Sequence, residues 1–209
     1  MGLLEQKTLI EQDEALKIIG GRLSGVYKSI TNAWEAYLSY PIDKRVIHSD
    51  SCKAHIIHCH MVHEATKFVE QTEGIEVLER KKLYMFVVDA KLAIRFKKFD
   101  ESYISKNQPT KQVKDFRGQL QLAGIEASHN LEAGYILDQD GQLKAVHLVC
   151  PSGLKSNYWE VLLTQSGSES IVSDLFAKKV DEEGGKKVNR IKRKKEATII
   201  QIANENGKA

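Results

Sequence analysis

The spacing of apolar residues changes once along this chain of 209 residues, at about Gly74. Before Gly74 the apolar residues recur every three or four positions, as they do on one face of an α-helix. After it they form short continuous or alternating runs bounded by turn residues, as in β-strands. Because helices and strands are segregated along the sequence, the predicted fold class is α+β, with N-terminal helices packed on a mostly antiparallel sheet.

Three helices are expected before the change, over residues 4–19, 22–40 and 49–71. Gly20-Gly21 ends the first helix and Pro41 ends the second. The second helix carries an apolar stripe, which consists of Val26, Ile30, Trp34 and Leu38. Such a stripe is typical of a helix face buried in the core, and the alternative is an interface in a homo-oligomer.

Two hairpins are expected to build most of the sheet. The first joins residues 83–88 to 92–99, and the second joins 131–138 to 142–150 through a turn that contains Asp140-Gly141. Smaller elements are expected around them: strands at 75–78 and 158–163, a helix after Thr110, and a short helix over 171–180.

The first hairpin joins the strongest strand signal in the chain to a run of positive charge. An even number of residues in its turn would place Leu83, Met85, Val87, Leu92, Ile94 and Phe96 on one face, which would be core. The other face would then hold Tyr84 and Phe86 beside Arg95 and Lys97. Aromatic rings beside cations suit stacking on nucleic-acid bases with phosphate contacts, and they equally suit a partly covered sheet face.

Most of the net positive charge lies at the C-terminus. Residues 1–185 hold 23 Lys and Arg against 26 Asp and Glu, whereas residues 186–209 hold 8 against 2. The cations cluster at Lys186, Lys187, Arg190, Lys192, Arg193, Lys194 and Lys195. The predicted organisation is a helical region 1–73 that forms one domain with 74–180, followed by a linker and basic tail, 181–209. The tail is expected to contact nucleic acid or a protein partner, and a solvated, flexible tail is the alternative.

Histidine and cysteine are concentrated between His48 and His63, which hold five of the seven histidines and two of the three cysteines. On a helix, His55, Cys59 and His63 would share one stripe, and these residue types bind zinc. One helix brings only two such neighbours to a single ion, and no zinc motif accompanies them. The leading expectation is therefore that no cofactor is bound, with the three residues packing at a helix edge.

Glu64, Asp89 and Lys91 suggest a second catalytic alternative, a magnesium-dependent nuclease of the restriction-endonuclease type. Asp89-Ala90-Lys91 has the residue types of its acid-x-Lys pair, and Glu64 on the preceding helix would be a further ligand. However, Asp89 and Lys91 fall in one tight turn, without a separate upstream strand aspartate. Turns favour aspartate for conformational reasons alone.

Three cysteines and the lack of a signal or membrane-spanning segment favour a cytoplasmic protein with reduced thiols. Several short segments are typical of small bacterial or phage proteins, without resembling a particular family. The leading hypothesis is a non-enzymatic binding protein, a regulatory or antitoxin-like defence accessory component that contacts nucleic acid or a protein. The alternatives are a metal-dependent nuclease and a structural subunit of an oligomer.

Overall fold

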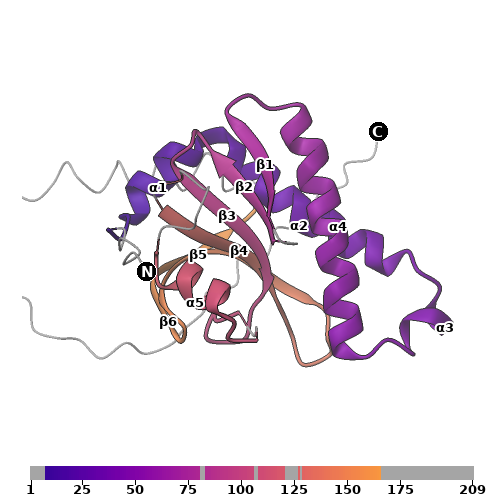
Figure 1. The fold of residues 1–209 in the computed structure, drawn as a ribbon. Coiled ribbons are helices and arrows are strands. Elements are labelled where there is room, and N and C mark those ends of the chain that lie inside the picture. The colour runs from indigo at the N-terminus through magenta and orange to yellow at the C-terminus, as the bar shows by residue number, and fades with distance from the viewer. Residues whose placement is uncertain (1–7, 81–82, 106–107, 121–126, 128, 166–209) are drawn as a thin grey trace, which may run out of the picture.

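The computed structural model describes residues 8–80, 83–105, 108–120, 127 and 129–165. One mixed sheet forms the middle layer, with α1, α2 and α4 on one face and α5 on the other (Figure 1). The helices are α1 Gln12–Ile19, α2 Leu23–Leu38, α3 Ile42–Arg45, α4 Asp50–Glu70 and α5 Lys111–Arg117, with a 3-10 turn at Gly20–Arg22. The strands are β1 Ile75–Arg80, β2 Leu83–Val88, β3 Leu92–Lys98, β4 His129–Leu137, β5 Leu143–Gly153 and β6 Ser156–Leu163.

The sheet follows the chain order from β1 to β6. All neighbouring strands are antiparallel except β3 and β4, which are parallel and are joined by a crossover that contains α5. Each predicted hairpin is thus extended by a third strand, β1 or β6. The predicted α+β class, with N-terminal helices on a mostly antiparallel sheet, is confirmed.

Local signals explain the helix boundaries. The Ser49 side chain accepts a hydrogen bond from Cys52 N at 3.3 Å and caps α4. Gly20 ends α1 with a φ of 55°, a conformation that glycine adopts without strain. The long helices α2 and α4 pack closely at Gly25, where an added Cβ would lie 2.2 Å from the Phe68 ring.

The apolar stripe of α2 is part of the core. Val26, Ile30 and Trp34 are buried in the cluster that α1, α2 and α4 form with the sheet, and only Leu38 is exposed, at 36%. The core interpretation of this stripe is confirmed. Three of its four side chains are covered within the chain, so the stripe is not an exposed interface, and a homo-oligomer stays a prediction.

The hairpin between β2 and β3 corrects the predicted strand parity. Val88 pairs with Leu92 and Phe86 with Ile94, so the turn contains three residues instead of an even number. Asp89 and Ala90 both adopt positive φ angles, 48° and 53°, which closes this odd turn. Phe86 therefore faces the helices together with Ile94, and Arg95 lies on the opposite face.

No helix in the described part of the chain is long and apolar enough to cross a membrane. The predicted helix over 171–180 and the predicted linker and tail, 181–209, lie outside the described residues. The predicted domain boundary at residue 180 stays a prediction for the same reason.

Candidate functional site

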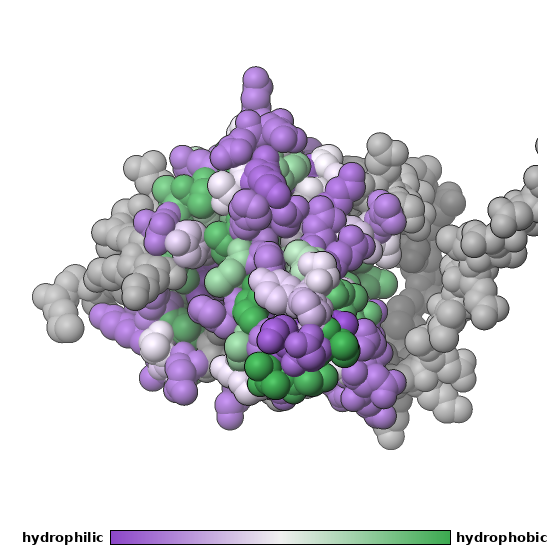
Figure 2. Space-filling view, turned by 90° about the vertical axis from the view of Figure 1, so that its right-hand side faces the viewer, coloured by the Kyte–Doolittle hydropathy of each residue, from purple (hydrophilic) through white to green (hydrophobic). Residues whose placement is uncertain are grey.

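The most exposed apolar side chains of the described residues lie at the corner between α2 and α4. Ile42, Val46 and Ile47 are 66%, 72% and 76% exposed, and together they are called the α3 tip. Figure 1 shows α3 at the far end of the α2–α4 helix pair, beyond the edge of the sheet. Apolar residues also gather on this face of the molecule in Figure 2. The tip is therefore a convex apolar projection.

Aromatic and histidine side chains hold the base of the tip in place. The Tyr37 and His48 rings lie 5.9 Å apart between centroids, and a 3.3 Å hydrogen bond joins Tyr40 Oη to His60 Nε2. Arg45 Nε donates to the Tyr40 carbonyl at 3.0 Å. These contacts fix the connection to α4, so the three aliphatic side chains project from an ordered support.

The predicted zinc ligands His55, Cys59 and His63 all lie on α4, where their side chains are exposed. Among the described residues, no group of three His, Cys, Asp or Glu side chains is placed to hold a metal ion. His129, a histidine outside α4, makes a 2.9 Å hydrogen bond through Nδ1 to the Thr8 carbonyl. A zinc site at these residues stays an untested prediction.

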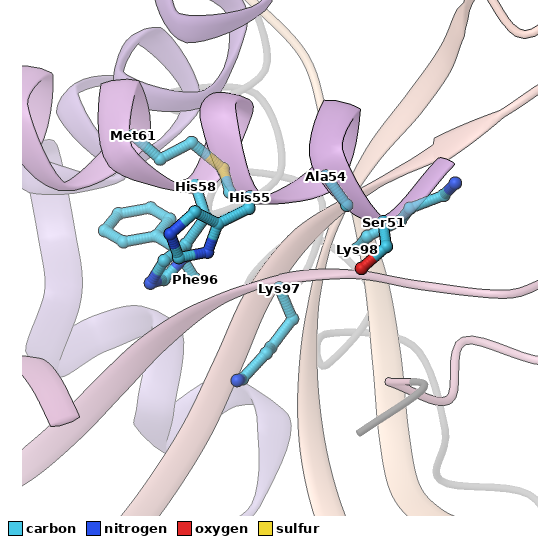
Figure 3. Close-up of a pocket in the computed structure, with 8 residues that line it drawn as sticks. All are labelled: Ser51, Ala54, His55, His58, Met61, Phe96, Lys97 and Lys98. Carbon is cyan, nitrogen blue, oxygen red and sulfur yellow. The ribbon is translucent and has the colours of Figure 1, made fainter. Parts of the chain in front are cut away.

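A pocket of about 290 Å³ lies between α4 and β3, and its lining includes His55, His58 and Lys98. The two histidines lie close together beside Phe96, whereas the Lys97 side chain points away from α4 (Figure 3). Burial, followed by the charges of Lys97 and Arg95, lowers the pKa of His58 to about 4. This histidine is therefore neutral at pH 7 and adds no positive charge that could attract an anion to the pocket.

The structure does not bring together the residues of the nuclease alternative. The Glu64 carboxylate accepts hydrogen bonds from Lys67 at 2.9 Å and Asn32 at 3.2 Å. Asp89 instead forms a bidentate ion pair with Arg22, at 2.9 and 3.1 Å. Asp89 and Lys91 line one pocket with Glu14 and His129, and Glu64 does not contribute to it. The two carboxylates that were predicted to bind the metal, Glu64 and Asp89, are thus each engaged by different side chains.

The predicted face of aromatic rings and cations does not form. Tyr84 and Phe86 lie on the sheet face that packs against α1, α2 and α4, and Phe86 is only 4% exposed. Arg95 and Lys97 lie on the other face, where Arg95 is 5% exposed. The prediction of a shared face was wrong because it assumed an even turn, whereas a role of these residues in binding stays a prediction.

Sequence reasoning missed a buried ionic network beneath the crossover between β3 and β4. Arg117 of α5 forms an ion pair with Glu132 of β4, and the two side chains are 1% and 0% exposed. Ser105 Oγ accepts a hydrogen bond from Arg117 and donates to Glu132 at 3.1 Å. The available signal was Glu132 itself, a charged residue between the apolar Leu131 and Ala133 in the buried middle of a strand.

The seven tail cations, from Lys186 to Lys195, lie outside the described residues, so their role stays a prediction. The described part thus offers two features that the sequence did not indicate, the α3 tip and the ionic network. No protein-family model, curated protein or solved structure matches this chain, and its function is therefore inferred from this geometry alone.

Proposed function

We propose that the protein is a non-enzymatic binding protein, of the regulatory or antitoxin-like kind, that docks a protein partner through the α3 tip. The observation that carries this proposal is the exposure of Ile42, Val46 and Ile47, each at least 66%, on an ordered projection. Burial of one such side chain contributes about 1.5–3 kcal/mol before the costs of association. Contiguous exposed apolar side chains of this kind typically mark an interaction site.

The shape and charge of the tip define the kind of partner. Two convex tips would touch over a small area, far below the roughly 800 Å² per partner of a standard interface, so a second copy of the chain fits poorly. A partner with a concave apolar groove fits the convex tip better. Lys44 and Arg45 lie between the aliphatic side chains in the sequence, with Asp43 paired to Lys44 at 3.6 Å, so an acidic rim would complement the groove.

Nucleic acid is the second candidate partner, and the seven cations between Lys186 and Lys195 favour it. The nuclease alternative is less favoured, because Glu64 and Asp89 have separate partners. A protein partner and a nucleic-acid partner would use different parts of the chain, so variants of the tip and of the tail separate the two.

The test compares the full chain with a triple variant, Ile42→Ser/Val46→Ser/Ile47→Ser. Both are used to recover partners from the native cell with and without nuclease treatment, and the stoichiometric protein partner is then purified. Its Kd for the triple variant is expected to be at least about 100-fold weaker, because most of the apolar burial is lost.

The matched control is Leu154→Ser/Leu162→Ser, which removes two exposed leucines, 39% and 48% exposed, from the β5–β6 hairpin. This control is expected to keep full affinity. The proposal is wrong if the purified partner binds the triple variant as tightly as the unchanged chain. Recovery that depends entirely on nucleic acid would favour the tail instead.

A further inference from the structure

Among the described residues, three cationic side chains surround one carboxylate on the sheet face that carries α5. Arg95 and Lys97 come from β3, Arg117 from α5, and Glu132 from β4. Arg95, Arg117 and Glu132 are only 5%, 1% and 0% exposed. Buried charges are normally balanced by partners, because desolvation costs several kcal/mol per ion. Each of these three buried side chains is therefore expected to have a partner.

The single carboxylate is already engaged by other groups. Glu132 pairs with Arg117 and accepts from Ser105. Arg117 directs its other N–H groups to the β5–β6 turn, where Nε donates to the Gly153 carbonyl at 3.0 Å and Nη2 donates to Asn157 Oδ1 at 2.9 Å. Arg117 and Glu132 thus form a closed structural unit that does not hydrogen-bond Arg95.

Within the described part of the chain, Arg95 is not part of a comparable network of hydrogen bonds. Its guanidinium lies over the Phe116 ring, 4.7 Å from the centroid, and its buried Nη1 has no hydrogen-bond partner among the described residues. An unsatisfied buried donor costs about 1–3 kcal/mol, and more when it is charged. A planar guanidinium that is stacked on one face still presents its edge for bidentate contact with an oxyanion.

Lys97 adds a second charge on the same face, two residues along β3. Its side chain is only partly buried, so this end of the cluster reaches the surface. Burial, followed by the positive charge of Arg95, lowers the pKa of the Lys97 ammonium to about 8. A nearby anion would oppose both effects.

We propose that Arg95 and Lys97 bind a small tetrahedral oxyanion of the phosphate class on this face of the sheet, approached from the Lys97 side. The anion would accept a hydrogen bond from the buried Arg95 donor, which otherwise has no partner among the described residues. This site lies on the sheet face opposite α4, and it does not depend on docking at the α3 tip.

The test titrates the full chain with inorganic phosphate at pH 7, with calorimetry and the thermal midpoint as readouts. Wild type is expected to bind with a Kd of about 1 mM or tighter, and its midpoint should rise until the site is saturated. Arg95→Met keeps a long side chain over Phe116 and should lose the saturable rise. Lys91→Met, which removes an exposed cation from the β2–β3 turn, is the matched control and should bind like wild type.

Lys97→Met provides a second variant should Arg95→Met fail to fold, and its affinity is expected to fall about tenfold. A midpoint that rises linearly and equally with phosphate and with sodium chloride at matched ionic strength would reflect a general salt effect. That result, or equal phosphate affinity in wild type and the variant that folds, would overturn the proposal.

Discussion

Arg117 connects parts of the chain that are far apart in sequence. Its guanidinium reaches Ser105 at the start of the crossover, Glu132 in β4 and Asn157 in β6. The neighbouring Gln119 does the same through its amide, whose Nε2 donates to the carbonyl oxygens of Asn130 at 2.7 Å and of Pro151 at 2.8 Å. These two side chains fasten the crossover to the sheet, and the network therefore has a clear structural role.

The first prediction concerns Arg117→Met. Glu132 would remain buried without its cation, and breaking a buried pair in this way costs about 3–5 kcal/mol. The free energy of unfolding from urea titration should fall by that amount. Lys67→Met is the control, because the exposed Lys67–Glu64 pair should contribute less than about 1 kcal/mol. Similar losses in the two variants would contradict a dominant role for the buried pair.

The second prediction concerns pH and His147. Burial lowers the pKa of His147 to about 4, whereas an unfolded histidine titrates near 6.5. Between these values the unfolded chain binds the proton and the folded chain does not, so stability is full above pH 6.5 and falls as the pH drops towards 4. His147→Phe keeps a ring against Tyr103, whose centroid lies 4.6 Å from that of His147, and removes the titrating group.

The urea midpoint of His147→Phe should therefore depend less on pH between 6.5 and 4.5 than that of wild type. Part of the dependence should remain, because the pKa of His58 is also lowered to about 4, first by its burial. Identical pH profiles for the two proteins would show that His147 is not kept neutral by the fold.

At the scale of elements, α2 and α4 form the main helix pair, and Gly25 sets their separation. A Cβ at Gly25 would lie 2.2 Å from two atoms of the Phe68 ring. The third prediction is that Gly25→Ala lowers the free energy of unfolding by about 1–3 kcal/mol, the usual cost of overpacking. Gly21→Ala is the matched control, since no atom lies within 4 Å of its Cβ position. Urea titration of both variants measures the difference, and equal stabilities would contradict close packing at Gly25.

Periodicity and turn residues predicted most of the elements, because those signals are local. The helices α2 and α4 and the strands β2 to β6 agree with the expected segments to within a few residues. The predicted length of the turn after Val88 was wrong, because the sequence Asp89-Ala90-Lys91 does not reveal two consecutive positive φ angles. One misjudged turn residue moved Phe86 to the face opposite Arg95, and the predicted binding face was lost with it.

The two proposed sites depend on tertiary arrangements that the sequence does not display. Ile42, Val46 and Ile47 look like ordinary core residues until α3 is seen to project beyond the sheet. The missing partner of Arg95 Nη1 becomes apparent only when Glu132 is seen to pair with Arg117, 15 residues away along the chain. Tertiary pairing of this kind cannot be derived from spacing alone.

At the scale of the whole molecule, the sheet consists of two three-stranded antiparallel units, β1–β3 and β4–β6, joined by the parallel contact between β3 and β4. The helices α1, α2 and α4 share one apolar core with strands of both units. The N-terminal helices therefore stabilise the parallel junction. The α3 tip and the Arg95 cluster lie on different sides of this body, so their variants test separate functions.

The fourth prediction concerns the basic tail. Residues 1–185 carry a formal charge of −3, so affinity for duplex DNA should depend on residues 186–209 and their 8 cations. Cutting the chain after Gly185 should abolish binding to nonspecific duplex in a fluorescence anisotropy titration. For the full chain, the slope of log K against log salt should reach at most about −6, if all seven clustered cations contact phosphates.

The matched control changes the tail without changing its charge. Ile199→Ser/Ile200→Ser/Ile202→Ser keeps every cation, so duplex binding should be unchanged if attraction to phosphates drives it. A loss of binding in this variant would point to docking of the tail through its isoleucines instead. Duplex binding that survives the cut after Gly185 would place the nucleic-acid contact within residues 1–185. Binding that is insensitive to salt would show that attraction between the tail cations and phosphates does not drive it.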